Sequence, residues 1–359
     1  MKKATPERKH YLDNLRMFLM LVLVPGHTPG LNILFPKLIY PWWYGLMFAL
    51  AGITAYHSLK RRGAREFIKE RTSKLLIPFL FAVLIFVRIE KYFFGFRFYG
   101  TAYRYDFWAD LKNFNFLTTF SHFWFLLQLY PVAVLFAPIA KYLQRLEYRA
   151  KPENAGKASF AAISPWLFLC LFGIVILLMY NLIDPRSAFM ILGDIRMASS
   201  LLNEAKLGLS ILSFPVYFFL GYFALADEGM MEKLEKYCFL WSGIFAAAFI
   251  LAHFGPAALR DVLLPMSGVL GCLAFLGLFR RYFNSDNSKL VRYLVNSSFA
   301  VFLSHNTYLA IFTYLFTMKT DNPLIVIPAT ILSTFALTFL TYELLKRFRA
   351  TRWMFALRR

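Results

Sequence analysis

Charged side chains are scarce in this sequence of 359 residues. Asp, Glu, Lys and Arg make up 17% of the chain, whereas soluble domains contain about 25%. Hydrophobic residues make up 59%, and the mean hydropathy is +0.52. A membrane-spanning helix needs about 20 apolar residues, so ten spans would take up about 200 residues and leave only short loops. The composition therefore predicts an all-α polytopic membrane protein, with residues 1–359 forming one transmembrane domain.

Cysteines are also few, and they lack the spacing of metal ligands. Cys170, Cys238 and Cys272 lie within or at the edges of apolar runs, and their number is odd. We interpret them as small apolar side chains of helices, and we predict no metal site. The sequence shows no internal repeat, no heptad pattern and no low-complexity tract.

Ten apolar runs, separated by polar or basic connections, predict ten membrane-spanning helices. The division between two of these runs near Gly255 and Pro256 is short, and the aromatic stretch 93–120 leaves room for a further helix. Four basic residues precede the first run, but Arg16 and His27 interrupt it and no small-residue cleavage site follows. We therefore predict an uncleaved first span rather than a signal peptide. The runs cover residues 15–35, 41–59, 75–95, 122–140, 164–183, 207–226, 238–255, 260–279, 297–317 and 323–345.

Acidic residues are half as numerous as basic ones, with 20 Asp and Glu against 40 Lys and Arg. If the N-terminus is cytoplasmic, 28 of the basic residues fall on inner segments and 9 on outer connections. The positive-inside rule then predicts that both termini are cytoplasmic. Because the basic residues lie in short loops between apolar runs, their placement argues against nucleic-acid binding.

The first predicted span carries two ionisable residues, Arg16 and His27. They are eleven residues apart, so a helix places them within about 20° of one face and about 16 Å apart along its axis. Pro25 and Gly26 loosen the helix just before His27, and backbone groups freed in this way must line a protected cavity. Ionisable residues inside a membrane mark functional sites by default. Snorkelling of Arg16 and simple packing of His27 are the structural alternatives.

A second deep histidine, His305, lies in the stretch SSFAVFLSHNTYL. Ser298, Phe302 and His305 recur at helical spacing, so this span has a partly polar face. Structural and catalytic roles for His305 both stay open.

Two further groups of residues lie near the predicted outer ends of spans. Residues of the third span at this level are interpreted as interfacial anchors. Residues at the start of the fourth span are candidates for contact with a substrate. The first group comprises Arg88, Glu90 and Lys91, and the second comprises His122, Trp124 and Gln128.

The connection SLKRRGAREFIKERTSKLLIP is the most basic in the chain. Topology and contact with anionic lipid are sufficient to explain it. Alternatively, it forms a cytoplasmic site for a polyphosphate ligand, since Arg and Lys bind phosphate. Arg71 and Lys74 are three residues apart and would reach one group together.

Several stretches resemble motifs of the membrane acyltransferase-3 family. LDNLRMFLMLVLVPGH resembles the family signature, in which a leucine-aspartate pair leads to an Arg and, after ten residues, a His. The later stretches are weaker matches, but they follow the family's order and cover most of the chain. They are FALAGITAYHSLKRRGAREFIKERTSKLLIPFL, SHFWFLLQLY, SFAVFLSHNTYL and, more loosely, YELLKRFRATRW.

This resemblance implies a bacterial inner-membrane enzyme that moves an acyl group from cytoplasmic acyl-CoA to hydroxyls outside. Members include O-acetylases of O-antigen and exopolysaccharide and succinylases of periplasmic glucans. The implied donor is acetyl-CoA or succinyl-CoA, and the implied acceptor is a glycan or a lipid-linked glycan. The resemblance implies His27 as the catalytic residue and Arg16 as a residue of the acyl-CoA path. We further predict His305 as a second catalytic residue, Arg71 and Lys74 as acyl-CoA ligands, and His122, Trp124 and Gln128 as substrate contacts.

The sequence departs from the family pattern at two of these positions. Many members have arginine where this chain has Lys74, which keeps the charge but loses the bidentate fork. Many O-acetylases have glutamate where this chain has Gln128, so a carboxylate role there does not transfer.

A transporter or flippase for a small anion or lipid-linked sugar is the alternative function. Polar residues on one helix face would then line a substrate path. The absence of an inverted repeat and of paired broken helices argues against it. A scaffold without a substrate does not explain polar residues at this depth.

Overall fold

The computed structural model describes residues 9–31, 34–99, 106–112, 120–149, 164–182, 207–285 and 288–357. In these residues every regular element is helical, which confirms the predicted all-α class. The longer helices are α1 (His10–His27), α2 (Leu34–Arg61), α8 (Trp124–Arg149), α9 (Pro165–Leu182), α12 (Leu207–Leu220), α14 (Cys238–Phe254), α15 (Ala257–Tyr282), α16 (Lys289–Thr317) and α17 (Pro323–Leu345). The shorter elements are α3 (Ala64–Arg71), η1 (Thr72–Leu76), α4 (Ile77–Ala82), η2 (Val83–Val87), α5 (Arg88–Tyr99), α6 (Phe107–Lys112), η3 (Ser121–Phe123), η6 (Gly221–Leu225), α13 (Glu228–Lys236) and α18 (Arg349–Met354).

In the part of the chain that the structure describes, five helical segments are long and apolar enough to cross a membrane, and a sixth qualifies if two bent helices count as one span. The sixth joins α13 to α14 across a bend of 77°. The five cover residues 64–93, 121–146, 258–282, 289–317 and 323–345. Each of the ten predicted ranges overlaps a helix, but the number of ten spans and the cytoplasmic location of the termini stay predictions.

Two boundaries that were open in the sequence are visible in the structure. Gly255 ends α14 and Pro256 precedes α15, so the predicted short turn is confirmed. Within the stretch 93–120, α5 continues to Tyr99 and the short helix α6 follows. The other residues of that stretch, 100–105 and 113–119, lie outside the described residues.

The third predicted span is one long helix with two π-helical turns. Its successive elements are α3, η1, α4, η2 and α5. Pro78 has no N–H to donate to the turn before it, and the π turn Thr72–Leu76 lies at that position. π turns inside helices occur often at functional sites. The first π turn begins directly after Arg71, the last residue of α3, and it contains Lys74.

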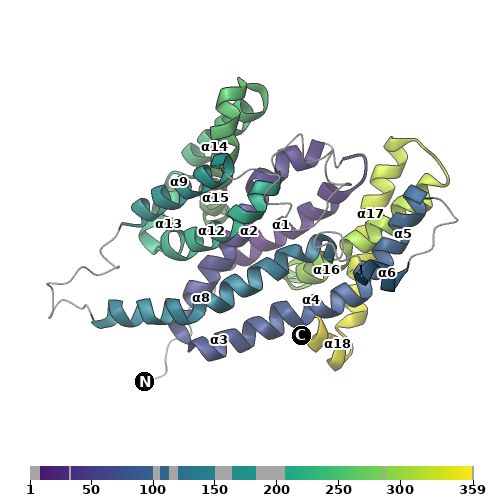
Figure 1. Ribbon diagram of the computed structural model, residues 1–359, viewed down its shortest axis with the longest axis horizontal. Helices are drawn as coiled ribbons and strands as arrows, with labels where there is room; N and C mark the ends of the chain where they lie inside the picture. The colour runs from purple at the N-terminus through teal and green to yellow at the C-terminus, as the bar shows by residue number, and fades with distance from the viewer. Residues whose placement is uncertain are drawn as a thin grey trace.

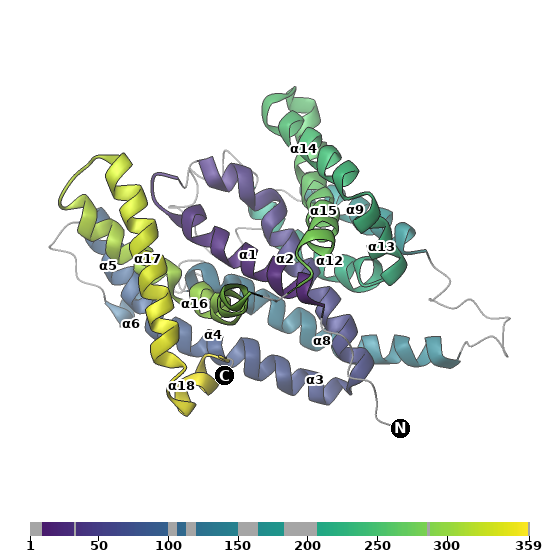
Figure 2. The same cartoon turned by 180° about the vertical axis from the view of Figure 1, so that it is seen from behind.

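The helices form a central group with two flanking groups (Figure 1). α1, α2 and α8 lie in the middle; α9 and α12–α15 lie on one side and α5, α16 and α17 on the other, as the reverse view also shows (Figure 2). α1 contacts α2, α15 and α16, so its side chains face both flanking groups. Trp43 of α2 donates its indole N–H to the carbonyl of Leu19 at 2.9 Å, which fixes α2 against α1.

Two glycines permit a close crossing of α2 with the α12–η6 helix. A Cβ added to Gly52 would lie 2.0 Å from the carbonyl oxygen of Phe218, and one added to Gly221 would lie 2.1 Å from that of Ala49. Backbone meets backbone at this crossing, so a side chain at either position would push the helices apart. Gly52 in the second predicted span is therefore a packing site.

We expect Gly52→Ala to destabilise the protein by about 1–3 kcal/mol, the usual range for overpacking. The midpoint of thermal unfolding in detergent should fall accordingly. Gly173→Ala in α9 is the matched control, because a Cβ there meets nothing within 4 Å and alanine favours helices. Equal midpoints for the two variants would contradict the close crossing.

Candidate functional site

Three histidines from three separate elements form a cluster. The ring of His305 in α16 lies 5.3 Å from that of His27 at the end of α1, centroid to centroid. The same ring lies 4.7 Å from that of His122 in η3. His305 is completely buried and His122 nearly so. The fold thus joins both predicted catalytic histidines with one of the predicted substrate contacts.

Hydrogen bonds to backbone carbonyls orient the imidazoles of the cluster. Nδ1 of His27 lies 3.0 Å from the carbonyl oxygen of Leu23. A ring nitrogen that contacts a carbonyl carries the hydrogen, so the neutral ring presents the lone pair on Nε2. His305 has the same arrangement, with Nδ1 2.9 Å from the Phe302 oxygen. Its Nε2 is buried and has no hydrogen-bond partner among the described residues.

Glu90 extends the cluster on the side of His122, and its interpretation as an interfacial anchor is wrong. It is 4% exposed, and Oε1 accepts hydrogen bonds from Ser121 at 2.6 Å and Asn306 at 3.1 Å. Its Oε2 lies 3.8 Å from Nδ1 of His122. Burying a carboxylate is costly unless such donors surround it, so Glu90 belongs to an organised polar site. The anchoring roles of Arg88 and Lys91 stay predictions.

Sequence reasoning missed Glu90, Ser121 and Asn306 as members of this site. The rule that ionisable residues inside a membrane mark functional sites could have identified Glu90, because it lies in an apolar run as Arg16 and His27 do. Asn306 directly follows His305 in the sequence. No pattern in the sequence indicates Ser121. Its backbone has a φ of 49°, in the left-handed region, and its hydroxyl meets Glu90 only in the folded chain.

A cavity of about 620 Å³ lies between the cluster and the basic connection. Its walls come from α1, α2, α3, η1, α8, α16 and the C-terminal segment. Two carboxylates and six basic side chains line it, so the excess charge is positive and suits a polyanion. The acidic residues are Asp13 and Glu70, and the basic residues are Arg16, Arg61, Arg62, Arg71, Lys74 and Arg352.

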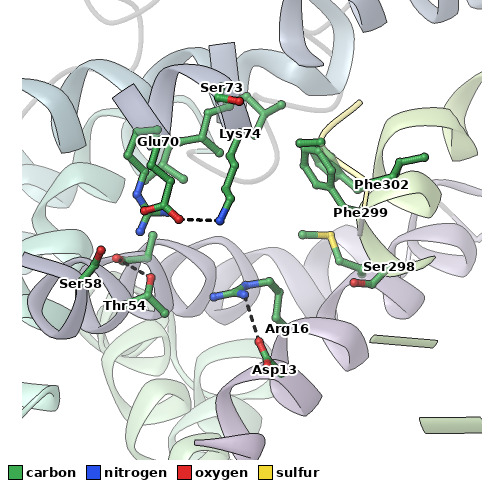
Figure 3. Close-up of a pocket in the computed structure, with 18 of the residues that line it drawn as sticks. Asp13, Arg16, Thr54, Ser58, Glu70, Ser73, Lys74, Ser298, Phe299 and Phe302 are labelled. Carbon is green, nitrogen blue, oxygen red and sulfur yellow. Dashed lines mark hydrogen bonds and ion pairs between the residues drawn. The ribbon is translucent and has the colours of Figure 1, made fainter. Parts of the chain in front are cut away.

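All three predicted donor ligands line this cavity. Figure 3 shows Arg16 and Lys74 directed into the same space from opposite sides. Arg16 lies 3.5 Å from Asp13, and Lys74 lies 2.5 Å from Glu70, which also pairs with Arg62.

Arg71 differs from these ion-paired residues. Its guanidinium lies over the ring of Phe67, 4.8 Å from the centroid. Its Nε is buried and has no hydrogen-bond partner among the described residues. A buried donor left unsatisfied costs free energy, so this N–H is suited to donate a hydrogen bond to a ligand.

Phe302 lies where the cavity meets the histidine cluster. Its side chain lines the cavity beside Phe299 and Phe125. Its ring is 5.5 Å from that of His122, whose Nε2 lies 3.0 Å from the Phe302 carbonyl oxygen. Phe302 thus lies between the basic side chains of the cavity and the histidine cluster.

The other two predicted substrate contacts lie apart from the cavity. Trp124 packs against Tyr44 and Phe214, with ring centroids 4.9 and 5.8 Å away. Gln128 is half-buried, and neither side chain is part of the cavity wall. Their role in binding an acceptor stays a prediction. Among the described residues, no three His, Cys, Asp or Glu side chains are grouped so as to hold a metal ion.

The sequence profile of the acyltransferase-3 family, described as an acyltransferase domain, matches residues 9–343. The chain belongs to the acyltransferase-3 family. No curated protein and no solved structure matches it. The family assignment confirms the resemblance and identifies the chain as a membrane acyltransferase. The matched range includes the histidine cluster and every basic residue of the cavity except Arg352.

Proposed function

We propose that this acyltransferase moves an acetyl or succinyl group from cytoplasmic acyl-CoA to a hydroxyl of an extracytoplasmic glycan or lipid-linked glycan. The observation that carries the proposal is the buried Nε of Arg71, which has no hydrogen-bond partner in the described part of the chain and lies in a cavity with excess positive charge. CoA carries several phosphate groups, and guanidinium groups bind phosphate with charge-assisted hydrogen bonds. The apolar end of the cavity, at Phe299 and Phe302, suits the pantetheine arm.

In the proposed reaction, His27 is the general base. The acceptor hydroxyl donates its hydrogen to Nε2 of His27 as its oxygen attacks the thioester carbonyl. The new C–O bond forms, the C–S bond breaks, and the proton on His27 neutralises the departing CoA thiolate. The carbonyl of Leu23 holds His27 in the tautomer that this step needs. His305 and His122 line the side of the reacting groups, and Glu90 orients His122.

The proposal includes an orientation in the bacterial cytoplasmic membrane, with both termini and the basic cavity on the inside. The 28 to 9 distribution of basic residues supports it. Arg16 and His27, on one helix about 16 Å apart, would then hold the donor and the reacting carbonyl at different depths. The membrane would separate the source of the acyl group from the acceptor.

The test is acyl transfer by the purified protein in detergent. We expect acetyl-CoA or succinyl-CoA to release free thiol at a rate that rises when oligosaccharides from the bacterial envelope are added. Mass spectrometry should then detect the acyl group on the oligosaccharide. Uptake of a labelled anion into proteoliposomes, without thiol release, would contradict the proposal and favour a transporter.

A further inference from the structure

The last residues of the chain form part of the cavity wall. Arg352, Trp353, Ala356 and Leu357 line the same space as Arg16. These four residues follow α17 and lie beyond residue 343, where the match to the acyltransferase domain ends. This chain therefore completes the cavity with a segment outside the matched domain.

Backbone interactions fold this segment back on the end of α17. The Thr351 hydroxyl donates to the carbonyl of Leu345, and Arg352 Nη1 donates to that of Lys346 at 3.0 Å. The Leu357 N–H in turn donates to the carbonyl of Arg352 at 2.9 Å. Between them, Ala356 has a φ of 49°, a conformation that non-glycine residues adopt only where their surroundings hold it.

Phe355 anchors the segment against the third span. It is 2% exposed, and its ring lies 5.8 Å from that of Phe86 and 6.4 Å from that of Phe81. Phe86 belongs to the second π turn, so the segment is packed on the same long helix that carries Arg71 and Lys74. Burial of this phenylalanine fixes the position of Arg352, three residues earlier.

We propose that residues 349–357 close the acyl-donor cavity and that Arg352 binds a phosphate of the donor's nucleotide part. The proposal rests on acyl-CoA being the donor. A guanidinium has five N–H groups in a planar fork, so the bond to Lys346 leaves others for a ligand in the cavity. Arg352 thereby makes the enzyme select donors that carry a phosphorylated nucleotide.

The experiment compares acetyl-CoA with S-acetylpantetheine, which has the same thioester but no phosphate. Arg352→Gln should raise the KM for acetyl-CoA about tenfold and leave both kcat and the kinetics with S-acetylpantetheine nearly unchanged. Arg352→Lys should give a smaller rise in KM because the charge remains. Arg349→Gln is the matched control: Arg349 is exposed on the same helix and is not part of the cavity wall, so its KM should equal that of the wild type.

Phe355→Ala supplies a second route to the same result. Loss of the anchor should release Arg352 and raise the KM for acetyl-CoA selectively, while turnover of S-acetylpantetheine shows that the protein is folded. If the wild-type enzyme transfers acetyl from acetyl-CoA and Arg352→Gln has the same KM, the assignment of Arg352 is wrong, but the proposed function stands. An equal rise in KM for both donors would also overturn this assignment. A wild-type protein that consumed no CoA thioester would overturn the proposed function, and this assignment with it.

Discussion

Replacing His27 by alanine is expected to lower the rate of acyl transfer by about 10²- to 10⁴-fold, the usual contribution of a general base. The expectation rests on the contact between Nδ1 and the Leu23 carbonyl, which leaves Nε2 as the basic nitrogen. Alanine removes that nitrogen and leaves the hydroxyl of the acceptor without a base. The quantity to measure is kcat for thiol release from acetyl-CoA at saturating donor.

His253→Ala is the matched control for this variant. Its Nδ1 lies 2.9 Å from the carbonyl oxygen of Phe249, four residues earlier, so it repeats the local geometry of His27 on another helix. It lies in α14, away from the cluster, and its replacement should leave kcat unchanged. A stably inserted His27→Ala protein with near-normal kcat would contradict the role of His27 as base.

The arrangement of the site explains why His27 alone is assigned the proton transfer. His305 has the same Nδ1 contact as His27, but it is completely buried. His122 is held between the Phe302 carbonyl and Glu90. His27 follows Pro25 at the end of α1, where the helix stops and the chain turns at Thr28. His27 is half-buried, whereas His122 and His305 are buried, so we assign the proton transfer to the histidine that is least enclosed.

The sequence was sufficient for those features that depend on a single helix. Apolar runs predicted the helices, and the spacing of Arg16 and His27 predicted that they lie on one face of the first of them. A site for a polyphosphate ligand at Arg71 and Lys74 was one of two interpretations of the basic connection, and both residues line the cavity with Arg16. Local spacing and charge determine these features, so no tertiary information was needed.

The features of the site that the sequence did not predict depend on contacts between distant segments. Glu90 meets Asn306 over 216 residues of sequence, and His122 meets the Phe302 carbonyl over 180. No periodicity in one run shows such a contact. An acidic residue near the end of a predicted span is equally consistent with interfacial exposure and with burial in a polar site. Only the packing of α5, η3 and α16 distinguishes the two.

Arg352 is a further case in which the tertiary structure changes the meaning of a residue. In the sequence it is one of several basic residues after the last span, where the positive-inside rule explains them all. In the structure, the fold of α18 turns it into the cavity, while Arg349 of the same helix is exposed. Under the proposed assignment, neighbouring residues of one basic segment would serve topology and ligand binding.

Replacing Arg71 by alanine is expected to raise the KM for acetyl-CoA about 10- to 100-fold with little change in kcat. A hydrogen bond to a charged group is worth about 1.5–3 kcal/mol, and each 1.4 kcal/mol corresponds to a factor of about ten in affinity. Replacement of Arg71 should raise this KM more than replacement of Lys74 or Arg16, because Lys74 is already paired with Glu70 and Arg16 with Asp13. Those pairs must be broken or shared when a phosphate binds, whereas the buried Nε of Arg71 has no protein partner among the described residues to give up.

The control for this variant is Arg65→Ala, which removes the same guanidinium from an exposed position of the same helix α3. Arg65 is not part of the cavity wall, so its loss changes the charge of the basic connection without changing the proposed site. If that connection only set topology and attracted lipid, the two variants would have the same KM. A rise confined to Arg71→Ala, partly restored in Arg71→Lys by the retained charge, would distinguish a built phosphate site from a basic surface. The position of one unsatisfied N–H, rather than the total charge of the loop, would then decide where the donor binds.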